Sequence, residues 1–196
     1  IVPIEDNDIS KQLQRSFKKL GIKILTQTSV EKVDVKDKCI VYAKTKDSEQ
    51  TIDCDVVLSA VGIEANIEGI GLEELGVSIE NGRVIVDKFY RTNIPGIYAI
   101  GDMLPTQALA HVASAEGILC VEKITGHDVE PLNYSNIPGC TYCSPEIASV
   151  GLTEEKAKEL GYEVKVGKFP FSASGKASAA GHKDGFVKVV FDAKYG

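Results

Sequence analysis

The stretch RTNIPGIYAIGD (residues 91–102) carries the strongest fold signal in the chain. Its Pro95-Gly96 pair predicts a turn, and the apolar run that follows predicts a short buried strand. Gly101 removes side-chain bulk, and Asp102 follows at the carboxyl end of the strand, where open α/β sheets bind their ligands. A carboxylate there can accept hydrogen bonds from sugar or ribitol hydroxyls. A lone Gly-Asp pair would merely cap the next turn, but the whole spacing favours a ligand site.

Residues on the N-terminal side of this stretch alternate between helical and extended patterns. Apolar residues with helical spacing predict an amphipathic helix over residues 8–20. Residues 21–30 are strand-like, and the alternating runs 30–35 and 39–45 predict a hairpin. The run DVVLSAVG (residues 55–62) is apolar on both faces and predicts a buried central strand.

Residues on the C-terminal side predict one long helix and then a different kind of domain. The helix is expected over residues 107–123, where small residues would let a ligand or another backbone approach closely. Short strands are expected within residues 139–151, 162–171 and 186–191, around a helix in TEEKAKELG (residues 153–161). This pattern predicts an α+β unit.

Composition excludes several functional classes. Of the 196 residues 43% are hydrophobic and 26% are charged, which indicates a folded protein. No apolar run is long enough to span a membrane, so we expect no membrane partner. The net charge is −6 and the lysines are scattered, so we expect no nucleic acid partner. The five cysteines suit a reducing compartment, and the missing initiator Met suggests a fragment of a longer chain.

The motif at residues 91–102 resembles the second flavin-binding motif of the two-dinucleotide-binding-domain flavoproteins: Thr, six residues, Ala, an apolar residue, Gly and Asp. Four further segments resemble the dihydrolipoamide dehydrogenases, within the class I pyridine nucleotide-disulfide oxidoreductases. They are Ala108-Leu-Ala-His with Glu116-Gly117, CTYCSPEIASVGLTE (140–154), GKFPFSASGKA (167–177) and DGFVKV (184–189). The resemblance covers essentially the whole chain.

The resemblance implies an α/β flavoprotein fragment with three parts. Residues 1–63 would be the C-terminal part of an NAD-binding domain, and residues 64–132 a central, FAD-contacting domain. Residues 133–196 would begin an α+β interface (dimerisation) domain that is truncated.

The resemblance also implies a set of cofactor-binding residues. Asp102 would bind the ribitol of FAD, with Gly101 giving the chain room, while residues 108–111 would present N–H groups to the pyrimidine edge of the flavin. Gly62 would lie near bound NAD, although the basic residues and the proline that usually follow it are absent, and Val30 would line the adenosine pocket. The alternatives are a hairpin core residue for Val30, helix-start packing for residues 108–111 and a surface or capping imidazole for His111. The full set is Gly62, Val30, Gly101, Asp102, Ala108, Leu109, Ala110 and His111.

The family's catalytic elements are missing from these residues. There is no G-x-G-x-x-G loop, no redox-active cysteine pair spaced by four residues and no His-Glu dyad, so we assign no catalytic residue and expect the chain alone to be inactive. Cys140 and Cys143 have the spacing of a redox or metal pair, but the strand-like residues around them favour a structural role over a regulatory thiol or a metal ligand. We expect no metal site.

The activity implied for the parent protein is electron transfer from dihydrolipoamide through a redox-active disulfide and FAD to NAD, with a role in cell redox homeostasis. The implied partners are a second copy, forming a homodimer, and the lipoyl-bearing acyltransferase core of a 2-oxo acid dehydrogenase complex. The implied location is the cytoplasm or, alternatively, the mitochondrial matrix. Two alternatives stay open: another disulfide reductase of the glutathione or mercuric reductase type, and a non-catalytic flavin-binding or dimerisation module.

Overall fold

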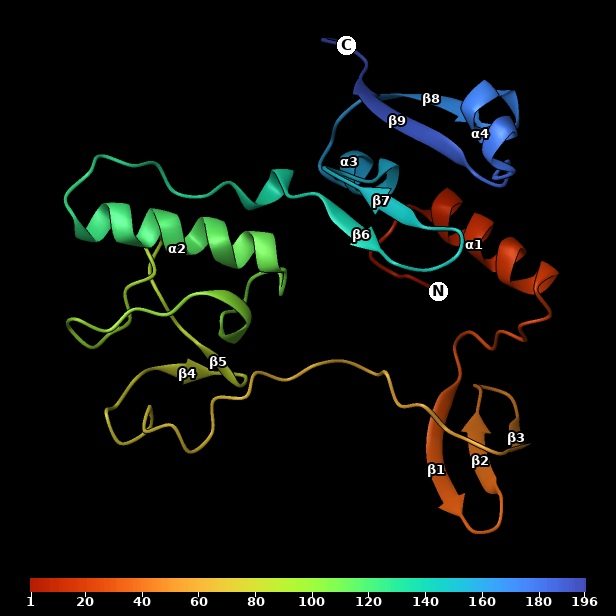
Figure 1. Cartoon of the computed structure of the whole chain (residues 1–196), viewed down its shortest axis with the longest axis horizontal. Coiled ribbons are helices and arrows are strands. Elements are labelled where there is room, and N and C mark those ends of the chain that lie inside the picture. Colours follow the sequence, from red (N-terminus) through yellow and green to blue (C-terminus); the bar gives the residue numbers. More distant parts are fainter. The chain divides into compact units, whose positions relative to one another are not determined.

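The computed structural model describes all residues, 1–196, and the chain divides into two compact units (Figure 1). Unit 1 comprises Ile1–Ser59 and Pro138–Gly196, and unit 2 comprises Ala60–Ile137. All strand pairs in both units are antiparallel. None of the helices is both long enough and apolar enough to cross a membrane.

Unit 1 begins with helix α1 (Asn7–Lys19), which confirms the helix predicted over residues 8–20. The Asp6 side chain caps it by accepting a 2.9 Å hydrogen bond from the N–H of Asp8. Lys18 and Lys19 lie in its last turn, where cations interact favourably with the helix dipole. Leu13 is buried on the inner face.

A three-stranded sheet follows in the order β1-β2-β3, formed by Ser29–Val35, Cys39–Lys44 and Glu49–Cys54. The hairpin predicted from residues 30–35 and 39–45 is confirmed as β1 and β2, with a bulge between Val30 and Lys32. The extended segment predicted at 21–30 contributes only its last two residues to β1. Strand β3 was not predicted.

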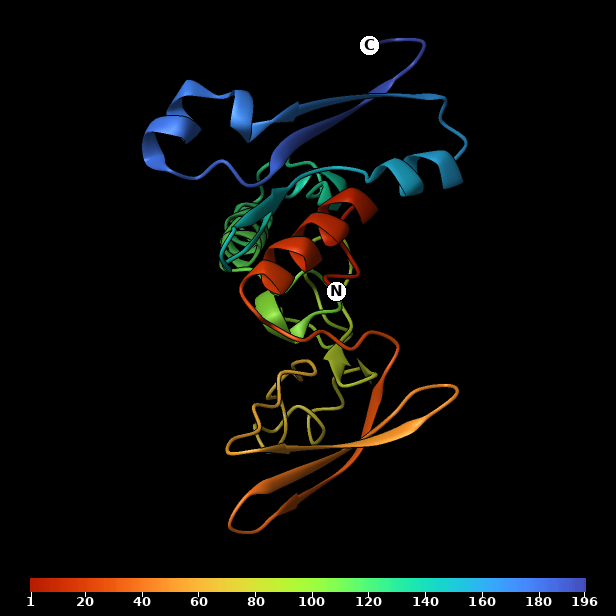
Figure 2. The same ribbon diagram turned by 90° about the vertical axis from the view of Figure 1, so that its right-hand side faces the viewer.

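The second half of unit 1 contains two hairpins and short helices. Strands β6 and β7 pair in the first hairpin, and β8 and β9 pair over seven positions in the second (Figure 2). The predicted helix at 153–161 is confirmed as α3, which Thr153 caps by accepting from the N–H of Lys156 at 3.1 Å. The bounds are β6 Gly139–Thr141, β7 Ile147–Ser149, α3 Glu154–Glu159, β8 Val164–Pro170, η3 Phe171–Ala173, α4 Gly175–Ala180 and β9 Phe186–Asp192.

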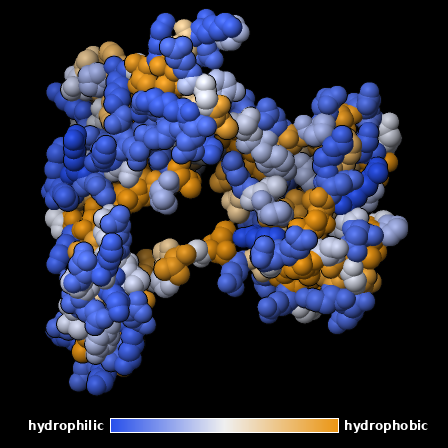
Figure 3. All heavy atoms as spheres, turned by 180° about the vertical axis from the view of Figure 1, so that it is seen from behind, coloured by the Kyte–Doolittle hydropathy of each residue, from blue (hydrophilic) through white to orange (hydrophobic).

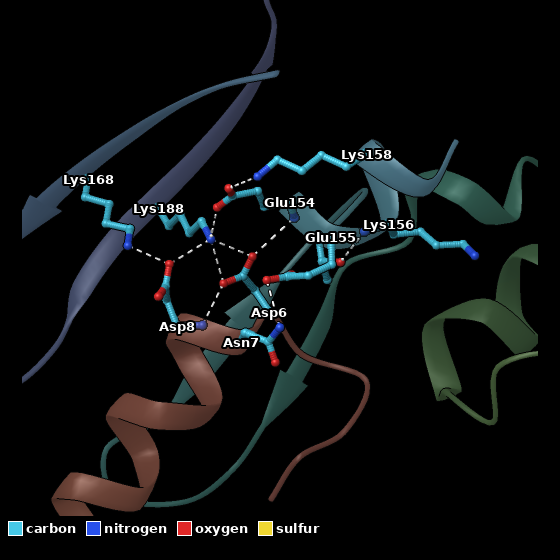
Figure 4. A network of polar contacts seen from close by, with 10 residues as sticks. Asp6, Asn7, Asp8, Glu154, Glu155, Lys156, Lys158, Lys168 and Lys188 are labelled. Carbon is cyan, nitrogen blue, oxygen red and sulfur yellow. Dashed lines mark hydrogen bonds and ion pairs between the residues drawn. The ribbon is translucent and has the colours of Figure 1, made fainter. Parts of the chain in front are cut away.

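A charged cluster joins both segments of unit 1 (Figure 4). The Lys188 side chain, on β9, is 5% exposed. Its Nζ lies 2.8 Å from carboxylate oxygens of Asp6 and of Asp8 and 2.7 Å from Oε2 of Glu154. The buried ammonium group is therefore neutralised by side chains from the start of α1 and from α3.

Unit 2 contains strands β4 (Ile79–Glu80) and β5 (Arg83–Val84), the 3-10 helices η1 (Gly101–Met103) and η2 (Tyr134–Asn136), and helix α2 (Ala110–Ile124). The core lies between the loops and α2. Its buried residues are Ile67, Val77, Val84, Tyr90, Ala99, Leu104 and Cys120.

The prediction of a buried central strand at residues 55–62 is wrong. The segment forms no strand, and the exposed fractions of Val56, Leu58 and Val61 are 80%, 88% and 97%. A strand that is apolar on both faces needs pairing strands and covering layers, and no strand pairs with this segment. Exposed apolar side chains of this kind form the orange areas in Figure 3.

The strand predicted before Gly101 does not form as a regular strand either. Only an isolated bridge between Arg91 and Tyr98 forms there, although Ala99 is buried as expected. Helix α2 begins at Ala110, three residues later than predicted, because the chain is still extended at Leu109.

Candidate functional site

The turn that carries Gly101 and Asp102 packs closely against α2. Gly101 has φ +74°, a conformation that favours glycine, and a Cβ atom added to it would lie 3.2 Å from Cβ of Ala113. A Cβ added to Gly117 would lie 3.1 Å from Cδ1 of Ile100. The predicted role of small residues on this helix is thus visible as a close approach between η1 and α2.

A buried carboxylate holds this turn in place. Glu116 is fully buried, and its Oε2 accepts a 2.7 Å hydrogen bond from the N–H of Gly101. Its Oε1 accepts from the hydroxyls of Thr106 at 3.0 Å and Tyr134 at 2.7 Å. All three neighbours are donors, which suits a carboxylate because it accepts at both oxygens.

A second tyrosine extends the network. The hydroxyl of Tyr90 lies 3.1 Å from that of Tyr134, and since Tyr134 donates its only proton to Glu116, Tyr90 is the donor. Burial raises the pKa of Tyr90 and of Tyr134, and the hydrogen bonds to Tyr90 and Glu116 raise that of Tyr134 further. Both hydroxyls therefore stay protonated at neutral pH and can donate.

Asp102 itself is exposed, and its backbone carbonyl group is held by a hydrogen bond. The guanidinium group of Arg83, on β5, donates through Nη1 to the carbonyl oxygen of Asp102. Its Nη2 lies 3.5 Å from the carbonyl oxygen of Ile63, the residue after Gly62. Arg83 thus links the segment after Gly62 to the turn that presents the Asp102 carboxylate.

The other predicted residues of this region lie at the start of α2. Ala108 precedes the helix, Leu109 is its N-cap residue, and Ala110 and His111 are its first two residues. No side chain caps this end, and no acidic residue lies in the first turn. Helix N–H groups and the helix dipole therefore favour an electron-rich ligand here.

The remaining two predicted site residues are Gly62, in unit 2, and Val30, in unit 1. Gly62 has φ +145°, and a Cβ atom added to it would have no neighbour within 4 Å. Val30 lies in β1, in unit 1, and is 61% exposed, so the alternative of a hairpin core residue is wrong. Its predicted place beside adenosine stays a prediction.

The Cys140–Cys143 pair lies at a hairpin and not at a helix start. Cys140 is exposed in β6, and the half-buried Cys143 thiol donates to the carbonyl oxygen of Pro145 at 3.0 Å. Strand β7 confirms the strand expected after the pair. The structure contains no group of three or more His, Cys, Asp or Glu residues that could hold a metal ion.

Sequence reasoning missed the roles of Arg83 and Tyr134 and used Glu116 only as part of a resemblance. One signal could have found Glu116. Ala113, Glu116 and Gly117 stand at positions i, i+3 and i+4 and therefore share one face of the helix. A carboxylate that is buried among small residues needs hydrogen-bond donors. Nothing local indicates Tyr134, which contacts Glu116 from 18 residues away.

Comparison with known proteins defines the class to which this fold and site belong. The model of the pyridine nucleotide-disulphide oxidoreductase family matches residues 1–117, and the model of the dimerisation domain of the same family matches residues 137–196. The chain therefore belongs to the pyridine nucleotide-disulphide oxidoreductase family, whose members are enzymes that use FAD and NAD.

Relatives with high sequence identity to the chain include dihydrolipoyl dehydrogenases. The chain is 48% identical to that of Rhizobium etli and 47% identical to that of Zymomonas mobilis, in both cases over its whole length. It spans 41% and 43% of those proteins, which is less than half of their length. The predicted resemblance is confirmed.

Solved structures confirm the fold class. LpdA from Mycobacterium tuberculosis superposes on 99% of the chain with a TM-score of 0.87 at 26% identity, and the match covers 42% of LpdA. The flavoprotein disulfide reductase RclA from Escherichia coli superposes on 98% of the chain with a TM-score of 0.89, covering 44% of RclA. Its 23% identity shows the shared fold alone.

Proposed function

We propose that the complete natural protein containing this chain is a dihydrolipoyl dehydrogenase, which oxidises dihydrolipoamide and reduces NAD through a redox-active disulfide and FAD. The observation that carries the proposal is sequence identity of 43–48% to dihydrolipoyl dehydrogenases over all or nearly all of this chain. The chain spans less than half of those relatives, so the disulfide and the acid-base residues would lie outside residues 1–196.

The turn at Gly101 supports the cofactor assignment. Its positive φ and the 3.2 Å approach to Ala113 disfavour any residue larger than glycine, and the next residue presents an exposed carboxylate. Asp102 would accept hydrogen bonds from the ribitol hydroxyls of FAD, and the start of α2 would face the electron-rich pyrimidine edge of the flavin. FAD would supply the redox chemistry between the disulfide and NAD.

Gly62 and Val30 would each contribute to binding of the pyridine nucleotide. Gly62 leaves the backbone open to a ligand because nothing lies near its missing Cβ atom. Val30 would offer an exposed apolar surface to adenosine. The division into an NAD part (1–63), a central part (64–132) and an interface part (133–196) belongs to the same proposal.

The proposal includes a homodimer, because residues 137–196 match a dimerisation domain. It also includes docking to the lipoyl-bearing acyltransferase core of a 2-oxo acid dehydrogenase complex, a role in cell redox homeostasis and a location in the cytoplasm. The location is supported by the bacterial origin of the relatives reported above.

The first experiment is purification of the complete natural protein, followed by its visible spectrum and a lipoamide assay. We expect an oxidised-flavin spectrum and NADH formation with dihydrolipoamide. D102N should weaken FAD retention, whereas D128N, the same change at an exposed loop position of unit 2, should not. A flavin-free protein would contradict the proposal, and reduction of glutathione disulfide or mercuric ion in place of lipoamide would favour another reductase.

A further inference from the structure

The polar network around Glu116 joins α2 to three other parts of unit 2. The carboxylate is completely buried 15 residues after Gly101, and no ion pair in the structure involves it. Burying a carboxylate without a cation is costly unless hydrogen bonds satisfy it. Here three hydrogen-bond donors satisfy it: the Gly101 N–H, the Thr106 hydroxyl in the loop after that turn, and the Tyr134 hydroxyl in η2.

The network reaches the ligand side of the turn through the backbone. The bond from the Gly101 N–H to Glu116 fixes the peptide between Ile100 and Gly101. Gly101 has the conformational freedom of glycine, so its position depends on this bond and on the packing against Ala113. The next residue is Asp102, whose exposed carboxylate projects from a backbone that Arg83 holds on the carbonyl side.

Backbone strain at Tyr90 is an independent sign that the network serves a purpose. Tyr90 has φ +67°, which is unfavourable for a bulky residue, although it is only 3% exposed. Strained residues of this kind persist where the surrounding structure holds them, and they concentrate at functional sites. In this conformation the Tyr90 hydroxyl reaches the hydroxyl of Tyr134.

We infer that Glu116 is a positioning residue for flavin binding, which acts through the Gly101 N–H to hold Asp102 in the orientation that receives ribitol hydroxyls. Tyr134, supported by Tyr90, holds the Glu116 carboxylate in turn. Tyr134 lies between residues 117 and 137, outside both segments that match the family models. The inference rests on the proposed function, since it needs FAD to be the ligand.

The test measures the affinity of the folded apoprotein for FAD in variants of the complete natural protein. E116Q has the same shape but one acceptor oxygen fewer. Its amide NH₂ group, which is a donor, would face at least one of the N–H and O–H groups that now donate to Glu116. A hydrogen bond to a charged group contributes enough that we expect the FAD dissociation constant to rise about tenfold or more. E122Q, the same change at an exposed position of α2, should leave it unchanged.

Y134F and T106V provide milder variants if E116Q does not fold. Each removes one hydroxyl donor from Glu116 and leaves the Gly101 contact in place. We expect several-fold weaker FAD binding in each, together with a changed visible circular dichroism spectrum of the bound flavin. Unchanged affinity and spectrum in both would overturn the inference.

A double-mutant cycle separates positioning from general stability. If Glu116 acts through Asp102, E116Q should weaken FAD binding much less in a D102N background than in the wild type. Equal, additive effects would overturn the inference and leave the proposed function intact. A wild-type protein that binds no FAD would overturn both.

Discussion

The N–H of Gly101 donates a 2.7 Å hydrogen bond to Oε2 of Glu116, a side chain that is completely buried in α2. The bond joins a glycine of the turn before Asp102 to a carboxylate that is held by two further donors. The backbone just before Asp102 is thus held by a buried side chain that residues of the following loop and of η2 hold in turn.

Replacing Gly101 by Ala should destabilise the turn by about 1–3 kcal/mol, because alanine is strained at φ +74°. The new methyl group would also press on Cβ of Ala113 at 3.2 Å. Urea unfolding of the complete protein measures the loss, and FAD retention should fall with it. The control is G139A in β6, where φ is not positive and nothing lies within 4 Å of the added Cβ. A G101A protein as stable as G139A would contradict the strain argument.

Replacing Lys188 by Met should lower the free energy of unfolding by about 3–5 kcal/mol, because the change leaves several carboxylates crowded around an uncharged side chain. The matched control is K168M. Lys168 also pairs with Asp8, but its side chain is 47% exposed, so its removal should cost less than about 1 kcal/mol. Similar losses in both variants would show that burial of Lys188 does not decide the effect.

The same cluster predicts a loss of stability in acid. Hydrogen bonds from Lys168 and Lys188 lower the pKa of Asp8 from 3.8 to about 2, and those from Lys158 and Lys188 lower that of Glu154 from 4.5 to about 2. Groups with a lowered pKa stabilise the fold above their unfolded values and lose that contribution as the pH falls through the folded values.

Urea unfolding between pH 5 and pH 2 measures the free energy of unfolding of the wild type and of K188M. The difference between these two free energies should become smaller below about pH 4.5. Acid removes the favourable pairs from the wild type, and in K188M it neutralises the carboxylates that repel one another. A difference that is independent of pH would contradict the assignment of these ion pairs.

The cysteines should differ in reactivity toward an alkylating reagent. Burial raises the pKa of Cys120, which is 5% exposed, so it should stay unmodified in the folded protein. Cys140 is exposed and should react first. Mass spectrometry over a time course, with urea-denatured protein as the control, measures both. Rapid modification of Cys120 or protection of Cys140 would contradict the placement of these thiols.

Helices with complete local signals could be predicted from the sequence. The amphipathic pattern, the acidic cap and the basic last turn are all contained within α1 and its flanking residues. Thr153 and the two glutamates after it give α3 the same completeness. Such elements need no distant partner to be recognised.

Strands that depend on distant partners could not be predicted in the same way. The hydrophobic run at 55–62 has the composition of a central strand, but the chain offers it no pairing strand. Strand β3, by contrast, alternates weakly and forms because β2 lies opposite to it over six residue pairs. Pairing decided the outcome in both cases.

The residues of the candidate site also differ in whether a local sequence signal reveals them. The turn at Gly101 and Asp102 was recognisable from the spacing of one short motif. Tyr134 was not recognisable, because its hydroxyl meets Glu116 only after the chain has passed along α2 and returned. Arg83 reaches the carbonyl group of Asp102 from 19 residues earlier, again without a local signal.

The position of Tyr134 also has a consequence for protein engineering. A chimera that exchanges the C-terminal domain of this protein for that of a relative would naturally be joined between the two matched segments, within residues 118–136. A junction before Tyr134 would import a foreign residue to face Glu116, whereas a junction after Asn136 keeps both partners native. Crossover points in such hybrids should therefore lie after Asn136, so that the Tyr134 hydroxyl and the Glu116 carboxylate come from the same parent.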